Sequence, residues 1–256
     1  KNKNVNLLTR LQAFEYHNFN ITKISDNGFL KGPLVMPGML TAFRYAAIRE
    51  ASGFTTGHLI EDYDLTAKLK SKGWQVSIAK DTEAWTMVPE DLGSLWKQRV
   101  RWVYGGLTVL RNYWKNIPTV FQDLFGHFLF ISLFTLVIFS FIFARSYNGN
   151  PTLILLLLIL SVINFLAANA FNLLTFLTYS QKDRVDWIIK LSLIPEFIYS
   201  NFLTLVLLGT YLFFVYNKLL GTLSRKVNFI LKIYKVGLVF FGKAGYSLSW
   251  GTRQSL

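Results

Sequence analysis

The sequence predicts an α/β domain that is followed by an amphipathic helix and then by membrane-spanning helices. Over residues 1–90, short apolar stretches alternate with helical patterns, an order that is typical of α/β domains. Residues 91–118 carry apolar side chains at helical spacing among many basic ones. Residues 119–216 contain long, almost uncharged runs of about the length that crosses a bilayer. The remaining residues, 217–256, form a basic tail that we expect in the cytoplasm.

The composition favours a membrane protein over a nucleic-acid-binding one. The 256 residues have a formal net charge of +13, and 52% of them are hydrophobic. A basic balance suits either nucleic acid or an anionic membrane surface, and the apolar runs after residue 120 decide for the membrane. The absence of cysteine excludes disulfide bonds and thiolate metal sites. The three histidines are scattered, so a histidine metal cluster is not expected.

The first ninety residues combine predicted helices with predicted short strands. Apolar positions predict an amphipathic helix over residues 5–20, and a short helix is predicted from Thr41 to Glu50. Short apolar or alternating stretches predict strands at residues 34–36, 74–79 and 84–88. These elements are the basis of the α/β assignment.

A tight turn, Pro37-Gly38-Met39, follows the first predicted strand. Glycine has no side chain to keep another group away from the backbone. Gly38 is therefore either an ordinary turn residue or a position that a substrate approaches closely.

Three acids, Glu61, Asp62 and Asp64, begin the next predicted helix, which ends before Gly73. Acids in a first helical turn complement the helix dipole and contribute about 0.3–1 kcal/mol each. The alternative is that one of these carboxylates faces a cleft and acts as a general base. The residues alone leave both interpretations open.

The helix predicted over residues 91–118 has two different faces. One face carries an amide, a guanidinium, an indole and a glycine, in the order Gln98, Arg101, Trp102 and Gly105. The other face is apolar and consists of Leu92, Leu95, Trp96, Val103, Leu107, Leu110 and Trp114. A guanidinium suits a phosphate, and an indole suits the apolar face of a sugar. The alternative is a juxtamembrane helix whose basic residues contact only lipid headgroups, namely Lys97, Arg99, Arg111 and Lys115.

Three apolar spans are predicted, over residues 124–144, 153–179 and 187–216. The second contains three amides that should face other helices or a polar path, Asn164, Asn169 and Asn172. The third is interrupted by Lys190, Pro195 and Glu196, which predicts a short interfacial piece and a kink before the span proper, with Glu196 at the headgroup boundary or inside the membrane. Residues 229–241 are too short to span and predict a surface helix. Basic residues on both sides of the third span leave the number of crossings open.

Two motifs together resemble a known family. Ile60-Glu61-Asp62, followed by Gln98-Arg99-Val100-Arg101-Trp102 and then by apolar spans, resembles the membrane-embedded family-2 glycosyltransferases, which include poly-N-acetylglucosamine, hyaluronan and cellulose synthases. Leu95 to Trp102 with the following Gly105-Gly106 is most similar to the poly-N-acetylglucosamine type. The segment from Gly38 to Arg44 is similar to the family's acceptor-side Gly-x-x-x-Ala-Phe-Arg. Each motif alone is of low specificity, but both in this order are informative.

The resemblance implies an inverting transfer from a UDP-sugar to a saccharide acceptor. By this resemblance Asp62 is the catalytic base, with Glu61 beside it. Gln98 and Arg101 help to hold the nucleotide diphosphate, and Trp102 stacks on the acceptor sugar. The full set of predicted substrate-binding residues is Gly38, Met39, Gln98, Arg99, Arg101 and Trp102.

The family's uridine-binding half, with its metal-binding Asp-x-Asp, lies N-terminal to the Glu-Asp motif and is not found in this sequence. We therefore expect this chain to be the C-terminal part of a GT-A-type domain, a fragment of a longer protein. The resemblance implies Mg²⁺ or Mn²⁺ bound mainly by that other half. No metal site is expected within this chain, although Asp62-Tyr63-Asp64 formally fits Asp-x-Asp and makes Asp64 a candidate ligand.

Three functions remain open at this point. The first is a processive synthase that extrudes a polysaccharide through its spans, and the second is a non-processive transferase acting on a lipid acceptor. The third is a non-catalytic membrane subunit. For the first two we expect a multi-pass protein of the bacterial plasma membrane with its catalytic part in the cytoplasm. The expected partners are the lipid bilayer and a small membrane subunit, and no nucleic acid.

Overall fold

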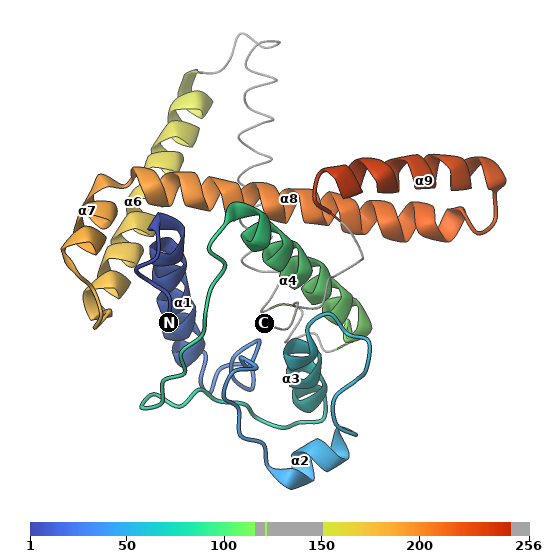
Figure 1. Ribbon diagram of the computed structural model, residues 1–256, viewed down its shortest axis with the longest axis horizontal. Helices are drawn as coiled ribbons and strands as arrows, with labels where there is room; N and C mark the ends of the chain where they lie inside the picture. Colours follow the sequence, from blue (N-terminus) through green and yellow to red (C-terminus); the bar gives the residue numbers. More distant parts are fainter. Residues whose placement is uncertain (116–120, 122–150, 247–256) are drawn as a thin grey trace.

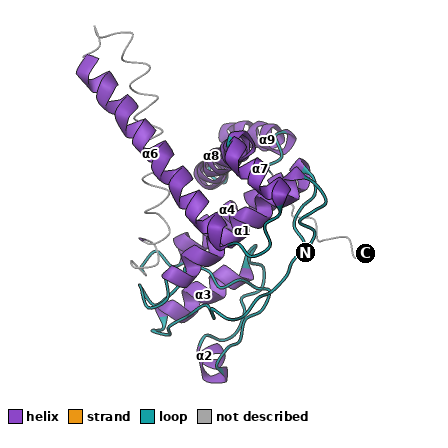
Figure 2. Ribbon diagram, turned by 90° about the vertical axis from the view of Figure 1, so that its left-hand side faces the viewer, coloured by secondary structure: helices purple, strands orange, loops and turns teal. Residues whose placement is uncertain are grey.

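The computed structural model describes residues 1–115, 121 and 151–246, so the first predicted span, residues 124–144, lies outside the described residues. The helices in the described part, in chain order, are α1 (Leu7–Ser25), α2 (Tyr45–Glu50), α3 (Glu61–Ser71), α4 (Leu92–Asn112), α6 (Pro151–Thr178), α7 (Arg184–Ser192), α8 (Ile194–Leu223) and α9 (Asn228–Lys243). Helix α8 lies across the ends of α1 and α4, and α2 and α3 lie on the opposite side of the molecule (Figure 1). Helix α6 projects away from the other helices (Figure 2).

The three predicted strands do not form in the described part of the chain, which contains helices and loops only (Figure 2). Two of the segments are paired by asparagine side chains instead of by a neighbouring strand. The Asn27 amide donates to the Ile78 carbonyl and accepts from the Ile78 N–H, both at 2.9 Å. The Asn2 amide does the same at Val88, again at 2.9 Å for both bonds. A strand requires a series of backbone hydrogen bonds to a second strand. In each of these segments one asparagine amide bonds to the backbone of a single residue instead. The α/β class is therefore not confirmed.

Helix α1 forms as predicted but extends five residues further, to Ser25. It begins with a capping box in which the Asn6 side chain accepts from the Thr9 N–H and the Thr9 hydroxyl accepts from the Asn6 N–H. Its apolar face buries Leu11 and Phe14 against residues of α4, α6, α7 and α8. One helix near the N-terminus thus contacts most of the apolar C-terminal part.

Helix α4 is the element between the acidic helix α3 and the apolar helix α8. Its N-cap is Asp91, whose carboxylate accepts from the Ser94 N–H at 2.8 Å. Toward α8 it buries Val100 and Tyr104 against Val206 and Phe213. The predicted apolar face is only partly correct, because Leu92 and Trp114 at its two ends are exposed.

The helix breaks at Lys190, Pro195 and Glu196 are where the sequence places them. Helix α7 ends at Ser192, Leu193 has a positive φ of 57°, and Pro195 lies in the first turn of α8. Lys190 and Glu196 form an ion pair of 2.6 Å across this corner. The prediction of a short piece, a kink and a long helix is therefore confirmed.

Helix α9 matches the predicted surface helix and folds back along α8 (Figure 1). Among the described residues that could be searched, α8 is the helix with both the length and the apolar composition to cross a membrane. Helix α6 has 28 residues and no Asp, Glu, Lys or Arg. Within it, Asn172 accepts a hydrogen bond from Asn18 of α1 at 3.0 Å, so this amide faces another helix, as predicted.

Candidate active site

A cavity of about 420 Å³ lies between the glycine turn and the start of α3. Its lining consists of Met36, Gly38, Thr41, Phe43, Phe54, Glu61 and Asp62. The two phenylalanines meet edge to face, with ring centroids 6.1 Å apart. The cavity thus joins the acidic motif to the segment that the sequence marks as acceptor-side. Met39 is not part of this lining, and its side chain is 49% exposed.

Asp62 is held by two backbone N–H groups. One carboxylate oxygen accepts from the N–H of Tyr63 at 2.8 Å, and the other accepts from the N–H of Gly38 at 3.3 Å. A Cβ on residue 38 would lie 3.5 Å from that second oxygen, which is ordinary contact. Gly38 is therefore not required by space alone, but its backbone does approach the carboxylate. The turn and the acid form one local unit, in which Asp62 is oriented toward the cavity.

Lys23, on the last turn of α1, is a cation near Asp62 that the sequence did not reveal. Burial lowers the pKa of the Lys23 ammonium, and the negative charge of Asp62 acts in the opposite direction. In the sequence, a lysine near a helix C-terminus is explained by the helix dipole. Only the tertiary structure brings this charge within electrostatic reach of the acid.

The polar face of α4 contacts the residues just before α3. Arg101 donates from Nη1 to the Leu59 carbonyl at 3.3 Å, and Trp102 packs on the cluster that contains Ile60. Gly105 allows this approach, since a Cβ there would lie 2.8 Å from Ile60. Arg101, Trp102 and Gly105 thus share the face that the helical spacing predicts. None of the α4 side chains lines the cavity around Asp62.

Gln98 has a buried side-chain oxygen that makes no hydrogen bond in the described structure. A buried acceptor without a partner is unfavourable by about 1–3 kcal/mol. A ligand donor or a water molecule would satisfy it, which is compatible with the predicted role of Gln98 beside the substrate.

Arg99 is buried and paired inside the protein, whereas the sequence placed it among the substrate-binding or lipid-contacting residues. Its side chain is 7% exposed, and Nη2 donates to Oε2 of Glu15 at 2.6 Å. The Tyr199 hydroxyl donates to the same oxygen, also at 2.6 Å. Helical spacing alone cannot show that a residue next to the polar face points into the protein and finds a partner 84 positions away.

Asp64 is also unsuited to hold a metal ion together with Asp62. Asp64 is 1% exposed, and one of its oxygens lies 3.3 Å from Nδ1 of His58. The Tyr113 hydroxyl faces the same carboxylate. Burial, the charge of Asp64 and a hydrogen bond to it together raise the pKa of Tyr113 to about 12. Residues two apart on a helix do not face each other, and the described residues contain no group of three His, Asp or Glu suited to a metal. These residues therefore do not fit the divalent cation that the family resemblance implies.

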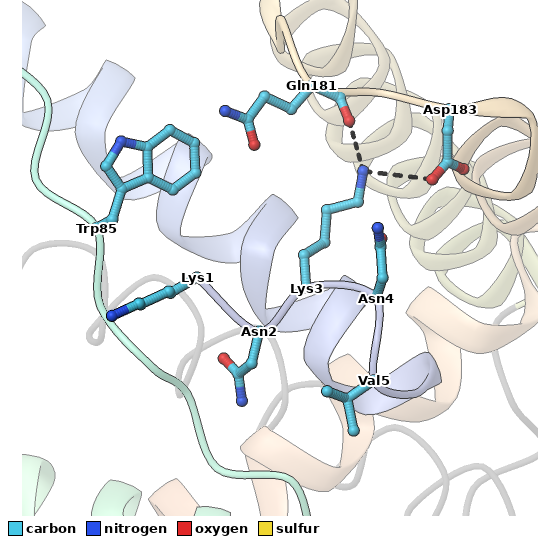
Figure 3. Close-up of a pocket in the computed structure, with 8 residues that line it drawn as sticks. All are labelled: Lys1, Asn2, Lys3, Asn4, Val5, Trp85, Gln181 and Asp183. Atoms are coloured by element: carbon cyan, nitrogen blue, oxygen red, sulfur yellow. Dashed lines mark hydrogen bonds and ion pairs between the residues drawn. The ribbon is translucent and has the colours of Figure 1, made fainter.

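A second cavity, of about 600 Å³, lies between the N-terminal segment and the loop before α7 (Figure 3). It is lined by Lys1–Val5, Trp85, Gln181 and Asp183. None of the predicted site residues borders it. Within this lining, Lys3 donates to the Gln181 carbonyl and pairs with Asp183. The smaller cavity at Asp62 is therefore the candidate active site.

Comparisons with known proteins identify relatives of this chain and its family. Over 115 residues the chain is 33% identical to the poly-beta-1,6-N-acetyl-D-glucosamine synthases of Staphylococcus epidermidis and Staphylococcus aureus strain COL. The aligned part is 44% of this chain and 28% of each relative, so the match spans less than a third of the length of these synthases. No solved structure matches the chain. The profile of the group named "Glycosyl transferase family group 2" matches residues 2–217, most of the sequence. This chain belongs to that family of glycosyltransferases.

Proposed function

We propose that this chain forms the acceptor side of an inverting glycosyltransferase that extends a polysaccharide at a membrane. The sugar is transferred from a UDP-sugar, and the relatives' names point to N-acetylglucosamine as that sugar. The single observation that carries the proposal is the Asp62 carboxylate, which is fixed by the Gly38 N–H at the edge of a cavity. The α4 motif contacts Leu59 and Ile60, just before the helix that carries Asp62.

The proposed chemistry begins with an acceptor hydroxyl in the cavity beside Asp62. Asp62 takes the hydroxyl proton while the oxygen attacks the anomeric carbon of the donor. The bond from that carbon to the diphosphate breaks, its electron pair leaves with UDP, and the configuration inverts. We assign the stabilisation of the charge on the diphosphate to Arg101 of α4, which donates to the Leu59 carbonyl just before α3. No step is assigned to a metal ion, and we propose that the divalent cation, Mg²⁺ or Mn²⁺, is bound by residues other than these.

Other residues of the site orient the acceptor. Glu61 lines the same cavity and is exposed, so it is placed to accept hydrogen bonds from sugar hydroxyls. Trp102 is half-buried and offers a flat apolar surface of the kind that packs on a sugar ring. The buried side-chain oxygen of Gln98, which has no hydrogen-bond donor in the described structure, would accept a hydrogen bond from the substrate. Gly38 and Met39 belong to the turn that carries the acceptor side of the cavity.

We also propose that the apolar helices bind a lipid bilayer in the bacterial plasma membrane, with the site on the cytoplasmic side. Helix α8 has the length and composition for a span. The uncharged helix α6 is 28 residues long, more than the roughly 20 residues that a bilayer requires. Helices that hold the site beside the bilayer would let a growing polymer leave the enzyme directly into the membrane region.

The proposed function is tested on the full-length protein in membranes supplied with labelled UDP-N-acetylglucosamine. Asp62→Asn keeps the size and polarity of the side chain but removes the base. We expect transfer to fall by about 10²- to 10⁴-fold, the usual contribution of a general base, while UDP binding is unchanged. Asp81→Asn, which alters an exposed loop acid, is the matched control and should keep full activity.

The product distinguishes the functions that the sequence leaves open. Long labelled polymer supports a processive synthase, whereas a single added sugar on a lipid supports the non-processive alternative. Full turnover by Asp62→Asn would show that another group accepts the proton, and no product from the wild type would indicate a non-catalytic subunit.

A further inference from the structure

A buried polar cluster joins three helices directly behind the α4 motif. Glu15 comes from α1, Arg99 from α4 and Tyr199 from α8. Both Arg99 Nη2 and the Tyr199 hydroxyl donate to the same oxygen of Glu15, each at 2.6 Å. The Arg99 side chain is 7% exposed and that of Glu15 is 14% exposed. The three side chains therefore form one connected unit that is largely shielded from solvent.

The guanidinium of this cluster lies on the aromatic residue of the motif. Its central carbon is 4.3 Å from the centroid of the Trp102 ring and 5.8 Å from that of the Tyr16 ring. The Trp102 and Tyr16 rings are themselves 6.2 Å apart and inclined by 32°. A planar cation this close to an indole makes a favourable cation–π contact. One side of the indole is thus held by a group that is itself fixed by two other helices.

The cluster is not explained by stability alone. Removing two charges from water is unfavourable, and a buried ion pair often stabilises a protein no more than apolar residues of the same size. Burial raises the pKa of Glu15, and the charge of Arg99 opposes this shift. What the ion pair provides, and an apolar contact does not, is a defined direction for the guanidinium plane.

We propose that Arg99, held by Glu15 and Tyr199, is a positioning residue that fixes the Trp102 indole for stacking on the acceptor sugar. This proposal rests on the acceptor role of Trp102 in the proposed function. Because Tyr199 belongs to α8, the cluster also ties the orientation of the indole to the apolar helix. An indole that is already ordered loses less conformational freedom when the acceptor binds.

The proposal is tested on the full-length enzyme by measuring the KM for N-acetylglucosamine oligosaccharide acceptors and for UDP-N-acetylglucosamine. Glu15→Gln removes the charge that holds Arg99, and Tyr199→Phe removes one hydroxyl. We expect each to raise the acceptor KM by about two- to tenfold, with the donor KM unchanged. Tyr216→Phe is the matched control, because it removes a hydroxyl that α8 uses to bond the backbone of α9; it should leave the acceptor KM unchanged.

A second background separates positioning from a general structural effect. If the cluster acts through the indole, Glu15→Gln and Tyr199→Phe should add nothing in Trp102→Phe enzyme, because the group they orient is already gone. Effects that simply add would overturn the proposal, since sites that act independently are additive. The proposal would also be overturned if the cluster variants raised the acceptor KM and the donor KM together.

The conservative variant Arg99→Lys keeps the charge but loses the planar fork. It should retain the fold yet show the raised acceptor KM, and a wild-type acceptor KM would overturn the proposal. If Trp102→Phe itself leaves the acceptor KM unchanged, the acceptor role in the proposed function is also wrong. If only the cluster variants are without effect, the proposed function stands and the positioning role alone is refuted.

Discussion

Asp62 and Asp64 are separated by one residue and have opposite surroundings. Asp62 faces a cavity and accepts from two backbone N–H groups, one of them from Gly38. Asp64 is enclosed, with His58 and Tyr113 beside its carboxylate. In the sequence both are acids in the first turn of a helix, and the helix dipole accounts for either. Only the resemblance to a family selected Asp62 as the catalytic base, which stays a prediction. In the structure Asp62, and not Asp64, lines the cavity.

Trp102 is the residue for which stacking can be tested most directly. Trp102→Ala removes the indole that we assign to the acceptor, so elongation should stop or require at least about tenfold more acceptor, given the size of aromatic contacts. Trp114→Ala removes the same kind of ring at an exposed position just beyond the C-terminal end of α4, and is the control. Product length on a gel and acceptor titration measure the difference. Equal product length in wild type and Trp102→Ala would contradict the assignment.

At the scale of the helix, α4 connects the site to the apolar part of the molecule. Its periodicity predicted correctly that Arg101, Trp102 and Gly105 share a face. It did not predict that Arg99 is buried, because a basic side chain among other basic side chains in the sequence resembles a solvated face. The strand predictions were wrong for a related reason. Alternating residues indicate an extended backbone, but the neighbouring strand that completes a sheet is not encoded in the segment itself.

Gly105 and Gly106, which are neighbours in α4, should respond differently to alanine. At position 105 a Cβ would lie 2.8 Å from the buried Ile60, so Gly105→Ala should push α3 away from α4 and destabilise the protein by about 1–3 kcal/mol. At position 106 the nearest atom would be 3.6 Å away, on Tyr63, so Gly106→Ala should be neutral or stabilise by up to about 1 kcal/mol through helix propensity. Thermal unfolding in detergent, followed by circular dichroism, compares them. A Gly105→Ala protein as stable as the wild type would show that this contact is not tight.

At the scale of the whole molecule, charged residues connect the first ten residues to the start of α7. Lys3 and Arg10 both pair with Asp183 and Asp186, and the Lys3 contact is visible in Figure 3. Asp186 is buried, so its two cations are needed to offset the loss of water. These contacts join residues that are 183 positions apart in the sequence, Lys3 and Asp186.

The ion pairs at the start of α7 make the stability of the protein depend on pH. The Arg10 hydrogen bond is the main reason that the pKa of Asp183 is lowered to about 2, from an ordinary value of 3.8. A carboxyl with a lowered folded-state pKa stabilises the protein above its unfolded pKa, and this contribution disappears as the pH falls from about 4 to about 2. Asp183→Asn retains an N-cap for α7 but does not titrate. The difference in unfolding temperature between the wild type and Asp183→Asn should therefore decrease over that range. A difference that is constant from pH 6 to pH 2 would argue against the ion pair.

The sequence alone determined which described segments are helical, that the helix breaks between Lys190 and Glu196, and which two motifs mark the family. These properties depend on periodicity, capping and turn residues, which act over a few positions. The tertiary structure decided which acid faces a cavity, that the extended segments have no strand partners in the described chain, and that Arg99 binds Glu15 and Tyr199. Each of these depends on contacts between residues far apart in sequence, such as Glu15 and Tyr199, which are separated by 184 positions. No local pattern carries that information, because the packing of α1, α4 and α8 creates those neighbours.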